Sequence, residues 1–225
     1  MNHSISAAQE KDGLILVNKP NGMTSHDVVN IARRAFGIRR IGHAGTLDPM
    51  ATGLLILGVG KSTKKLGDIT GSSKTYNTEI TLGATSTTDD KEGAIEKVGD
   101  TQPTLKQIQN ILEKFTGDIL QTPPIYSAIK VNGERAYKIA RRGETIKMEP
   151  RKITIHKIEL VSYKYPLLEI KTDVSSGTYI RSLARDIGKE LETGAYLSKL
   201  ERTSIGEYKL ENAIELEKIK DAEFF

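Results

Sequence analysis

The sequence of 225 residues contains no cysteine and no tryptophan. A chain without cysteine cannot form a disulfide, a thiolate zinc site or a cysteine nucleophile. It also needs no oxidising compartment, and we therefore expect a cytoplasmic protein.

Long apolar runs are missing as well. The apolar run at residues 54–57 is far shorter than the about 20 residues that cross a bilayer, so we expect no membrane partner. The N-terminus lacks the basic and then apolar pattern of a signal peptide. The histidines are not spaced as metal ligands on one helix or strand, so we expect no metal site. They are His3, His26, His43 and His156.

Charge is distributed unevenly along the chain, whose net charge is +4. Residues 1–65 hold nine basic against four acidic side chains, and residues 121–152 hold eight against three. Such basic blocks, the second with interleaved tyrosines, fit a polyanionic partner such as RNA, and a solvated charged surface is the alternative. The second block comprises Lys130, Arg135, Lys138, Arg141, Arg142, Lys147, Arg151 and Lys152.

Apolar periodicity predicts strands and helices in an irregular order. Helices are expected after Thr24 and after Thr104. Each of these threonines is followed three residues later by a side chain that can complete a capping box, Asp27 and Gln107 respectively. Another helix is expected after residues 175–177, a short basic one at 134–142, and a loop at 38–51. Because the elements do not strictly alternate, we expect an α+β fold with a mixed, mainly antiparallel central sheet flanked by helices. The predicted strands are residues 13–19, 53–59, 75–82, 126–132, 153–162 and 167–174.

One glycine-rich loop, residues 42–53, carries a candidate catalytic carboxylate. Asp48 precedes a proline, which favours an extended backbone at the aspartate. A carboxylate held on such a loop can serve as a nucleophile in glycosyl chemistry, and a simple Asp-Pro turn is the alternative.

Two further positions combine a tyrosine with a defined local structure. Tyr76 lies on a predicted strand, where its ring can stack on a nucleobase or fill the core. Tyr179 and Arg181 lie at the start of a predicted helix, outside its apolar stripe, and a solvated first turn is the alternative. An arginine there opposes the positive end of the helix dipole, so we expect it to have a carboxylate or phosphate partner.

Several blocks in the same order resemble the bacterial tRNA pseudouridine synthases of the TruB type, which isomerise uridine 55 in the TΨC loop. The resemblance runs from about Gly13 to Tyr208. Its blocks are VNKPNGMTS (17–25), GHAGTLDP (42–49), KTY (74–76), LGATSTTD (82–89), QTPPIYSAIK (121–130) and GTYIRSLA (177–184).

The resemblance implies a role for each candidate residue. It implies that Asp48 is the catalytic nucleophile, that Arg181 pairs with this aspartate, and that Tyr179 helps proton transfer. It also implies that Tyr76 stacks on the target base and that His43 enters the T-loop in place of the flipped base. The residues implied to line the pocket are Lys19 and Leu200.

The same resemblance implies the pseudouridine synthase fold and a single catalytic domain over residues 1–225 that acts as a monomer on the T-arm of tRNA, without cofactor or metal. The C-terminal PUA-type domain that family members usually carry is expected to be absent. The basic stretch at about 124–152 resembles the family's RNA-clamping insertion. Its candidates for RNA-backbone contacts are Lys130, Arg135, Arg141 and Arg142.

Two departures from the family pattern stand beside these expectations. A family CSKGTY run reads VSSGTY at residues 174–179, and a family LRRT run reads LERT at 200–203. The aspartate is expected to attack C1′, to attack the base, or to abstract a sugar proton and give a glycal. The alternatives to this function are an RNA-binding or tRNA-folding module with dispensable catalysis, and a pseudouridine synthase acting on another RNA.

Overall fold

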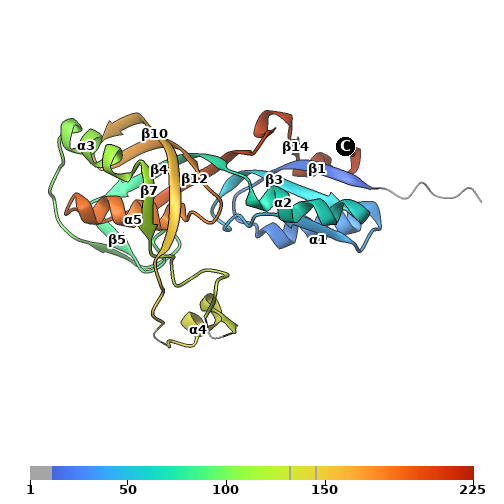
Figure 1. Cartoon of the computed structure of the whole chain (residues 1–225), viewed down its shortest axis with the longest axis horizontal. Coiled ribbons are helices and arrows are strands. Elements are labelled where there is room, and N and C mark those ends of the chain that lie inside the picture. The colour runs from blue at the N-terminus through green and yellow to red at the C-terminus, as the bar shows by residue number, and fades with distance from the viewer. Residues whose placement is uncertain (1–11, 132, 145) are drawn as a thin grey trace, which may run out of the picture. The chain divides into compact units, whose positions relative to one another are not determined.

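The computed structural model describes residues 12–131, 133–144 and 146–225, which form two compact units. Unit 1 contains the described residues up to Ser72 together with Arg202–Phe225, and unit 2 contains Ser73–Glu201. Figure 1 follows their helices and strands along the chain.

Unit 1 is built on a sheet whose strand β1 (Gly13–Lys19) lies between two others. β14 (Ile214–Glu215) is its parallel neighbour, and β3 (Thr52–Val59) is its antiparallel neighbour. β2 (Ile41–Ala44) pairs with the second half of β3. The other elements of unit 1 are α1 (Ser25–Phe36), η1 (Gly60–Lys65), α2 (Leu66–Gly71), β13 (Tyr208–Lys209), η2 (Leu210–Asn212) and η3 (Leu216–Asp221).

Helices α1 and α2 cover opposite faces of the sheet of unit 1. Apolar side chains of α1 pack with Leu55 and Leu57 of β3, whereas those of α2 pack with Leu54 and Ile56. Successive side chains of a strand point to opposite faces. Both faces of β3 are therefore buried, which explains its uninterrupted apolar run.

The predicted capping boxes are confirmed in both helices where the sequence indicated them. In α1, Thr24 Oγ1 accepts a hydrogen bond from Asp27 N at 3.1 Å, and Asp27 Oδ2 accepts one from Thr24 N at 2.9 Å. Gly37 then ends the helix with φ at 70°, in the left-handed region that favours glycine. Thr104 and Gln107 repeat the box in α3 (Leu105–Phe115).

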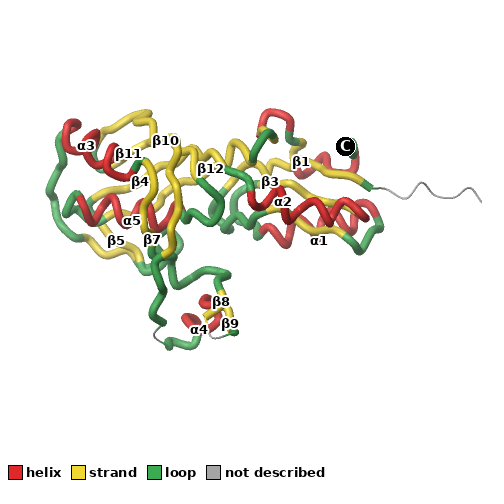
Figure 2. The backbone as a smooth tube through the Cα atoms, in the orientation of Figure 1, coloured by secondary structure: helices red, strands yellow, loops and turns green. Residues whose placement is uncertain are grey.

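Unit 2 is built on a group of strands in which neighbours from β4 to β7 pair antiparallel. Buried and more exposed residues alternate along β4 and β11, as predicted. α3 packs against β10, and α5 (Ile180–Glu190) packs against β4 (Figure 2). The strands in spatial order are β12 (Ala195–Ile205), β4 (Lys74–Leu82), β11 (Leu167–Val174), β10 (Arg151–Lys164) and β7 (Gly117–Gln121). A separate pair is formed by β5 (Ala84–Ser86) and β6 (Ile95–Lys97).

The basic stretch of unit 2 contains a small hairpin and a helix. β8 (Lys130–Val131) pairs antiparallel with β9 (Glu134–Arg135), and α4 (Ala136–Arg141) follows directly. The strand predicted at 126–132 is therefore too long, and its last residue lies outside the described ones. The helix predicted at 134–142 begins two residues later, because its first two residues pair as β9.

Two further strands differ from the prediction. The loop predicted at 38–51 contains β2, because the glycines there indicate a turn while Ile41 and Ala44 are buried against β3. The periodicity also does not predict β12, because its buried residues change phase twice. They are Ala195, Leu197, Leu200, Arg202 and Ile205. The predicted α+β class with a mainly antiparallel sheet is nevertheless confirmed.

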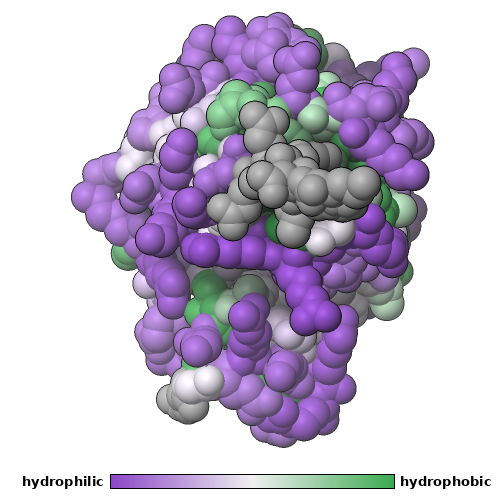
Figure 3. Space-filling view, turned by 90° about the vertical axis from the view of Figure 1, so that its right-hand side faces the viewer, coloured by the Kyte–Doolittle hydropathy of each residue, from purple (hydrophilic) through white to green (hydrophobic). Residues whose placement is uncertain are grey.

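The surface is mainly hydrophilic on the face drawn in Figure 3, with hydrophobic residues exposed in small areas. Within residues 12–131, 133–144 and 146–225, every helix is too short or too polar to span a bilayer.

Candidate functional site

The backbone just before Asp48 is held by a buried serine. Ser25, at the first position of α1, accepts a hydrogen bond from Leu47 N at 2.8 Å and donates one to Leu47 O at 3.1 Å. Asp48 O then accepts from Ala51 N at 3.1 Å, which closes a tight turn. Both polar backbone groups of Leu47 are thus satisfied by one hydroxyl group away from water.

The backbone just after the aspartate is held from the end of β1. Pro49 O accepts hydrogen bonds from Gly22 N at 2.8 Å and from Lys19 Nζ at 3.3 Å. The same ammonium group donates to Pro20 O at 2.8 Å and to Met23 O at 2.7 Å. Lys19 has no exposed surface. Its charge therefore joins the turn after β1 to the loop that carries the aspartate.

His43 lies on β2, in the same unit as this loop. Burial lowers the pKa of its imidazole, and the nearby charges of Arg202 and His26 lower that pKa further. Arg202 is itself buried and donates to Leu54 O at 2.8 Å and to Gly45 O at 3.0 Å. These effects favour the neutral imidazole. The start of the loop is fixed by an arginine that sequence reasoning did not single out.

Tyr76 and Leu200 lie on strands of unit 2. Tyr76 is on the covered face of β4, opposite Thr172 of β11, and only 7% of its surface is exposed. Leu200 is buried on β12. A tyrosine ring held on a strand in this way has little rotamer freedom left to lose when a base stacks on it.

Arg181 lies in the first turn of α5, where it is almost fully buried. Its guanidinium donates to Thr88 O at 3.0 Å and to Tyr126 O at 2.9 Å. The carboxylate of Asp90 lies 3.5 Å from the Nη1 atom. Asp90 is thus a carboxylate partner of Arg181 at this helix end, where its charge offsets the unfavourable helix dipole. The pairing of Arg181 with Asp48 that the family resemblance implies stays a prediction.

The acidic turn that holds Arg181 is itself well ordered by hydrogen bonds. Asp90 Oδ1 accepts from Thr88 Oγ1 at 2.6 Å and from Glu92 N at 3.0 Å. Its neighbour Asp89 accepts from Arg185 Nη1 at 2.9 Å. Burial raises the pKa of Asp89, while the charges of Arg185 and Arg181 oppose that rise. The two aspartates and two arginines form one charged network.

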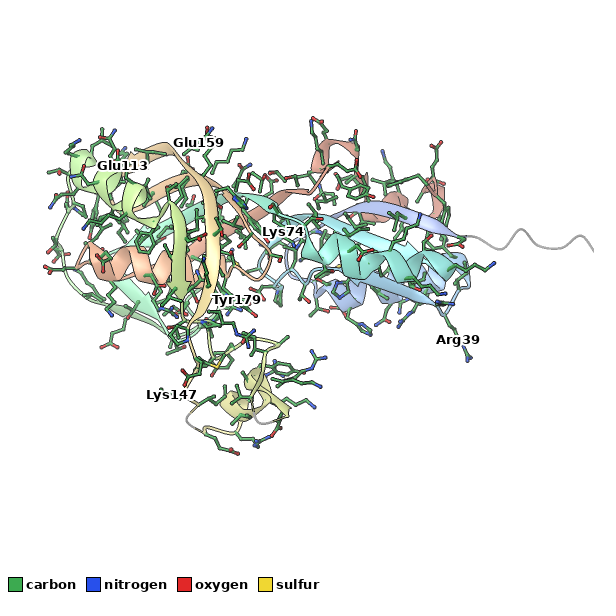
Figure 4. All side chains as sticks on the ribbon, viewed as in Figure 1. Arg39, Lys74, Glu113, Lys147, Glu159 and Tyr179 are labelled. Atoms are coloured by element: carbon green, nitrogen blue, oxygen red, sulfur yellow. The ribbon has the colours of Figure 1, made fainter. Side chains whose placement is uncertain are left out.

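Tyr179 is the residue that precedes α5, with an extended backbone at φ −102° and ψ 111° (Figure 4). The side chain of Gln121 forms hydrogen bonds with both of its backbone polar groups. Gln121 is buried at the end of β7 and was not singled out from the sequence.

The candidate residues are divided between the two units. Unit 1 carries Lys19, His43 and Asp48, whose loop, strand and turn are joined by the hydrogen bonds given above. Unit 2 carries the others, which are Tyr76, Tyr179, Arg181 and Leu200.

Two of the candidate RNA contacts lie opposite each other on the hairpin. Lys130 and Arg135 are exposed residues that pair directly across β8 and β9. Like charges in this position destabilise a hairpin unless an anion lies between them. Arg141 is exposed nearby, with its guanidinium 5.6 Å from the centre of the Tyr137 ring.

Arg142, the fourth candidate, already has acidic partners. It binds Glu134 through two nitrogens, at 2.5 and 2.9 Å, and Glu144 at 2.6 Å. Its charge is therefore largely neutralised within the protein. Lys147, further along the stretch, is exposed and also has an acidic partner, because its ammonium group lies 3.5 Å from Glu149 (Figure 4).

No group of three or more acidic or histidine side chains in the described part of the chain is close enough to hold a metal ion. The structure therefore defines an α+β protein whose exposed cations favour a polyanionic partner such as RNA.

Comparison with known proteins narrows this class to one family. A model described as "TruB family pseudouridylate synthase (N terminal domain)" matches residues 33–180. A second, described as "tRNA pseudouridylate synthase B C-terminal domain", matches residues 181–225. The chain belongs to the TruB family of pseudouridylate synthases, which confirms the predicted family and the predicted class of enzyme.

Curated relatives carry the name tRNA pseudouridine synthase B. The one from Corynebacterium diphtheriae is 44% identical over 93% of this chain and 72% of its own length. One from Arthrobacter sp. is 46% identical over 93% of this chain and 71% of its own length. One from Mycobacterium sp. (strain KMS) is 45% identical over 96% of this chain and 75% of its own length.

Solved structures give the same fold. A Cbf5–Nop10–Gar1 complex matches with a TM-score of 0.73 and 28% identity, over 93% of this chain and 54% of that one. A chain of an H/ACA ribonucleoprotein bound to a substrate RNA containing 2′-deoxyuridine matches with a TM-score of 0.71 and 26% identity. The match covers 93% of this chain and 52% of that one. This chain therefore spans about half the length of those solved chains, and the likeness confirms the predicted pseudouridine synthase fold.

Proposed function

We propose that this chain converts uridine 55 in the TΨC loop of tRNA to pseudouridine, with Asp48 as the nucleophile. In this isomerisation the bond from N1 to C1′ breaks and a bond from C5 to C1′ forms. The hydrogen of C5 leaves and N1 gains a proton, so no electrons are exchanged with a cofactor. A base inside the folded loop is out of reach, and flipping it out costs a few kcal/mol.

The observation that carries the proposal is the backbone around Asp48. Leu47 before it is tied by two buried hydrogen bonds and Pro49 after it by two more, so the aspartate stands on a fixed piece of chain. A nucleophile works best when its position is set before the substrate arrives, because little further ordering is needed at the reacting centre.

We assign proton transfer and stabilisation of the charged nucleophile to residues at the start of α5. Arg181 serves as the cation that keeps the nucleophile ionised, and Tyr179 helps to move the C5 proton. The hydrogen bonds from Arg181 to Thr88 O and Tyr126 O support this role, because they hold the guanidinium in one orientation.

We assign recognition of the flipped base to one ring in each unit. Tyr76 stacks on the target uracil, and its position on the covered face of β4 supports a rigid platform. His43 fills the space that the base leaves, and its lowered pKa supports this role because a neutral ring stacks without carrying a charge into the loop. We also assign binding of the base to Lys19, through the backbone that it holds, and to Leu200.

We assign the basic stretch at 124–152 to the RNA backbone. The unfavourable pair of Lys130 and Arg135 supports this role, because a phosphate between them relieves their repulsion. The proposed enzyme acts as a monomer in the cytoplasm, where its tRNA substrate is found.

The test is release of tritium from tRNA that carries it at C5 of uridine, measured under single-turnover conditions. The native chain should release tritium, and Asp48→Asn should release none while still binding tRNA. Asp68→Asn, at an exposed position of α2, is the matched control and should behave as the native chain. A folded native chain that binds tRNA without releasing tritium would instead be an RNA-binding module, and the proposal would fail.

A further inference from the structure

The hydrogen bonds between Gln121 and Tyr179 form a complete clamp on one residue. Gln121 Oε1 accepts from Tyr179 N at 2.8 Å, and Gln121 Nε2 donates to Tyr179 O at 3.1 Å. A neutral amide is the side chain that offers both a donor and an acceptor in this arrangement. Only 2% of Gln121 is exposed, so water does not compete for these bonds.

The backbone of Tyr179 is held on its helical side as well. Its carbonyl oxygen also accepts the first hydrogen bond of α5, from Leu183 N at 3.0 Å. Three hydrogen bonds therefore fix the two peptide groups on either side of one Cα atom. The Cα atom of Tyr179, from which the phenol ring projects, cannot shift along the helix axis unless at least one of these bonds breaks.

The next residue of the chain strengthens the same junction. Thr122 O accepts from Ser182 Oγ and from Arg185 Nη2, each at 2.9 Å. These two bonds tie the segment after β7 to α5, but neither of them contacts Tyr179. The junction thus separates into a part that holds Tyr179 and a part that holds only the helix.

We propose that Gln121 is a positioning residue of this enzyme, which sets where the hydroxyl group of Tyr179 stands during proton transfer. The proposal rests on the role proposed above for Tyr179. Gln121 itself contacts neither the substrate nor the reacting atoms; it acts by holding the backbone of Tyr179.

The experiment is a double-mutant cycle between Gln121 and Tyr179 with single-turnover tritium release from tRNA. Gln121→Met keeps the length of the side chain and removes both hydrogen bonds. We expect about a tenfold slower release, the effect of losing a well-placed hydrogen bond, with tRNA affinity unchanged. In a Tyr179→Phe background the same change should cost less than about twofold, because the hydroxyl that it positions is already gone.

Ser182→Ala is the matched control, since it removes a buried hydrogen bond of the same junction without touching Tyr179. It should lower the melting temperature, leave the release rate within about twofold of native, and add its small effect independently in the Tyr179→Phe background. Each protein is assayed at a temperature where circular dichroism shows it folded. Gln121→Glu, which keeps the acceptor for Tyr179 N, is the second variant if Gln121→Met does not fold. Its release rate should lie between the native rate and the tenfold lower rate expected for Gln121→Met.

The outcomes separate this proposal from the proposed function. If the native chain releases tritium and the Gln121 variants do so equally fast, the positioning role is wrong and the function stands. The positioning role is also wrong if the two changes are additive, if the loss is in tRNA affinity alone, or if Tyr179→Phe keeps the native rate. If the native chain releases no tritium, the function fails and the positioning role fails with it.

Discussion

Replacing Ser25 by alanine tests how firmly the loop of the nucleophile is held. The change removes one hydroxyl group that both accepts from Leu47 N and donates to Leu47 O. Both atoms of Leu47 then lose their partner inside the protein, where Ser25 is 2% and Leu47 3% exposed. Each unsatisfied buried group costs ~1–3 kcal/mol, so we expect unfolding to become easier by about 3 kcal/mol.

Helix propensity acts in the opposite direction. Ser25 is the first residue of α1, and alanine favours a helix more than serine does. A loss of stability in Ser25→Ala therefore reports the hydrogen bonds to the loop and not the helix. For a chain of this size, about 3 kcal/mol corresponds to a melting temperature lower by roughly 6–12 °C.

The catalytic consequence is measured with the same variant. Once Leu47 is released, Asp48 loses part of its fixed position, and a displacement of about 1 Å at a reacting group costs on the order of 100-fold in rate. We expect single-turnover tritium release to fall by about 10- to 100-fold at a temperature where the variant is folded, with unchanged affinity for tRNA.

The control is Ser162→Ala, which removes an exposed serine that donates to Glu169 at 2.8 Å. Its free energy of unfolding should stay within about 0.5 kcal/mol of native, because water replaces the lost partner. The reasoning is refuted if Ser25→Ala has the same melting temperature as the native chain. It is also refuted if the melting temperature is lower but tritium release keeps the native rate.

Three further predictions follow from other parts of the structure. Tyr76→Leu should slow single-turnover release by about 5- to 150-fold, the value of a lost stacking contact of ~1–3 kcal/mol, and an unchanged rate would exclude a stacking role. The folded-state pKa of His43 lies below its ordinary value of 6.5, so the unfolded chain binds more protons and unfolding becomes easier as the pH drops below about 6.5. His43→Gln should therefore lose less stability than the native chain between pH 7 and 5 in urea titrations; an equal loss contradicts the burial argument. Replacing Lys130 and Arg135 together by glutamine should reduce the salt dependence of tRNA binding by about 1.5 in the log–log slope, whereas Arg142→Gln should change it less, because Arg142 is paired within the protein. Equal slopes for both variants would contradict the assignment.

Local signals in the sequence predicted the elements that they specify directly. The cap at Thr24 and the alternation from residue 75 to 82 depend on neighbours three residues apart or fewer, and both were confirmed. β2 and β12 escaped prediction, because glycines indicate a turn at β2 and the buried residues of β12 change phase twice.

The partners of the candidate residues could not be predicted in this way. Arg181 bonds to a carbonyl 93 residues away, and Gln121 to a residue 58 away. Pairs of that kind leave no periodic trace in a single sequence, because each partner is chosen by the fold. The family resemblance supplied the candidate roles, and the structure supplied the groups that hold those side chains in place.

The loop that carries Asp48 is held through backbone atoms, and this has a consequence for transplantation. The side chains of Leu47 and Pro49 do not make the hydrogen bonds that fix their positions; the hydroxyl of Ser25 and the ammonium of Lys19 do. A designer who moved only residues 42–53 into another scaffold would carry over the sequence of the loop and leave its supports behind. The smallest portable piece that keeps the loop and its supports is therefore discontinuous: it is the loop together with residues 19–25 and Arg202, which donates to Gly45 O.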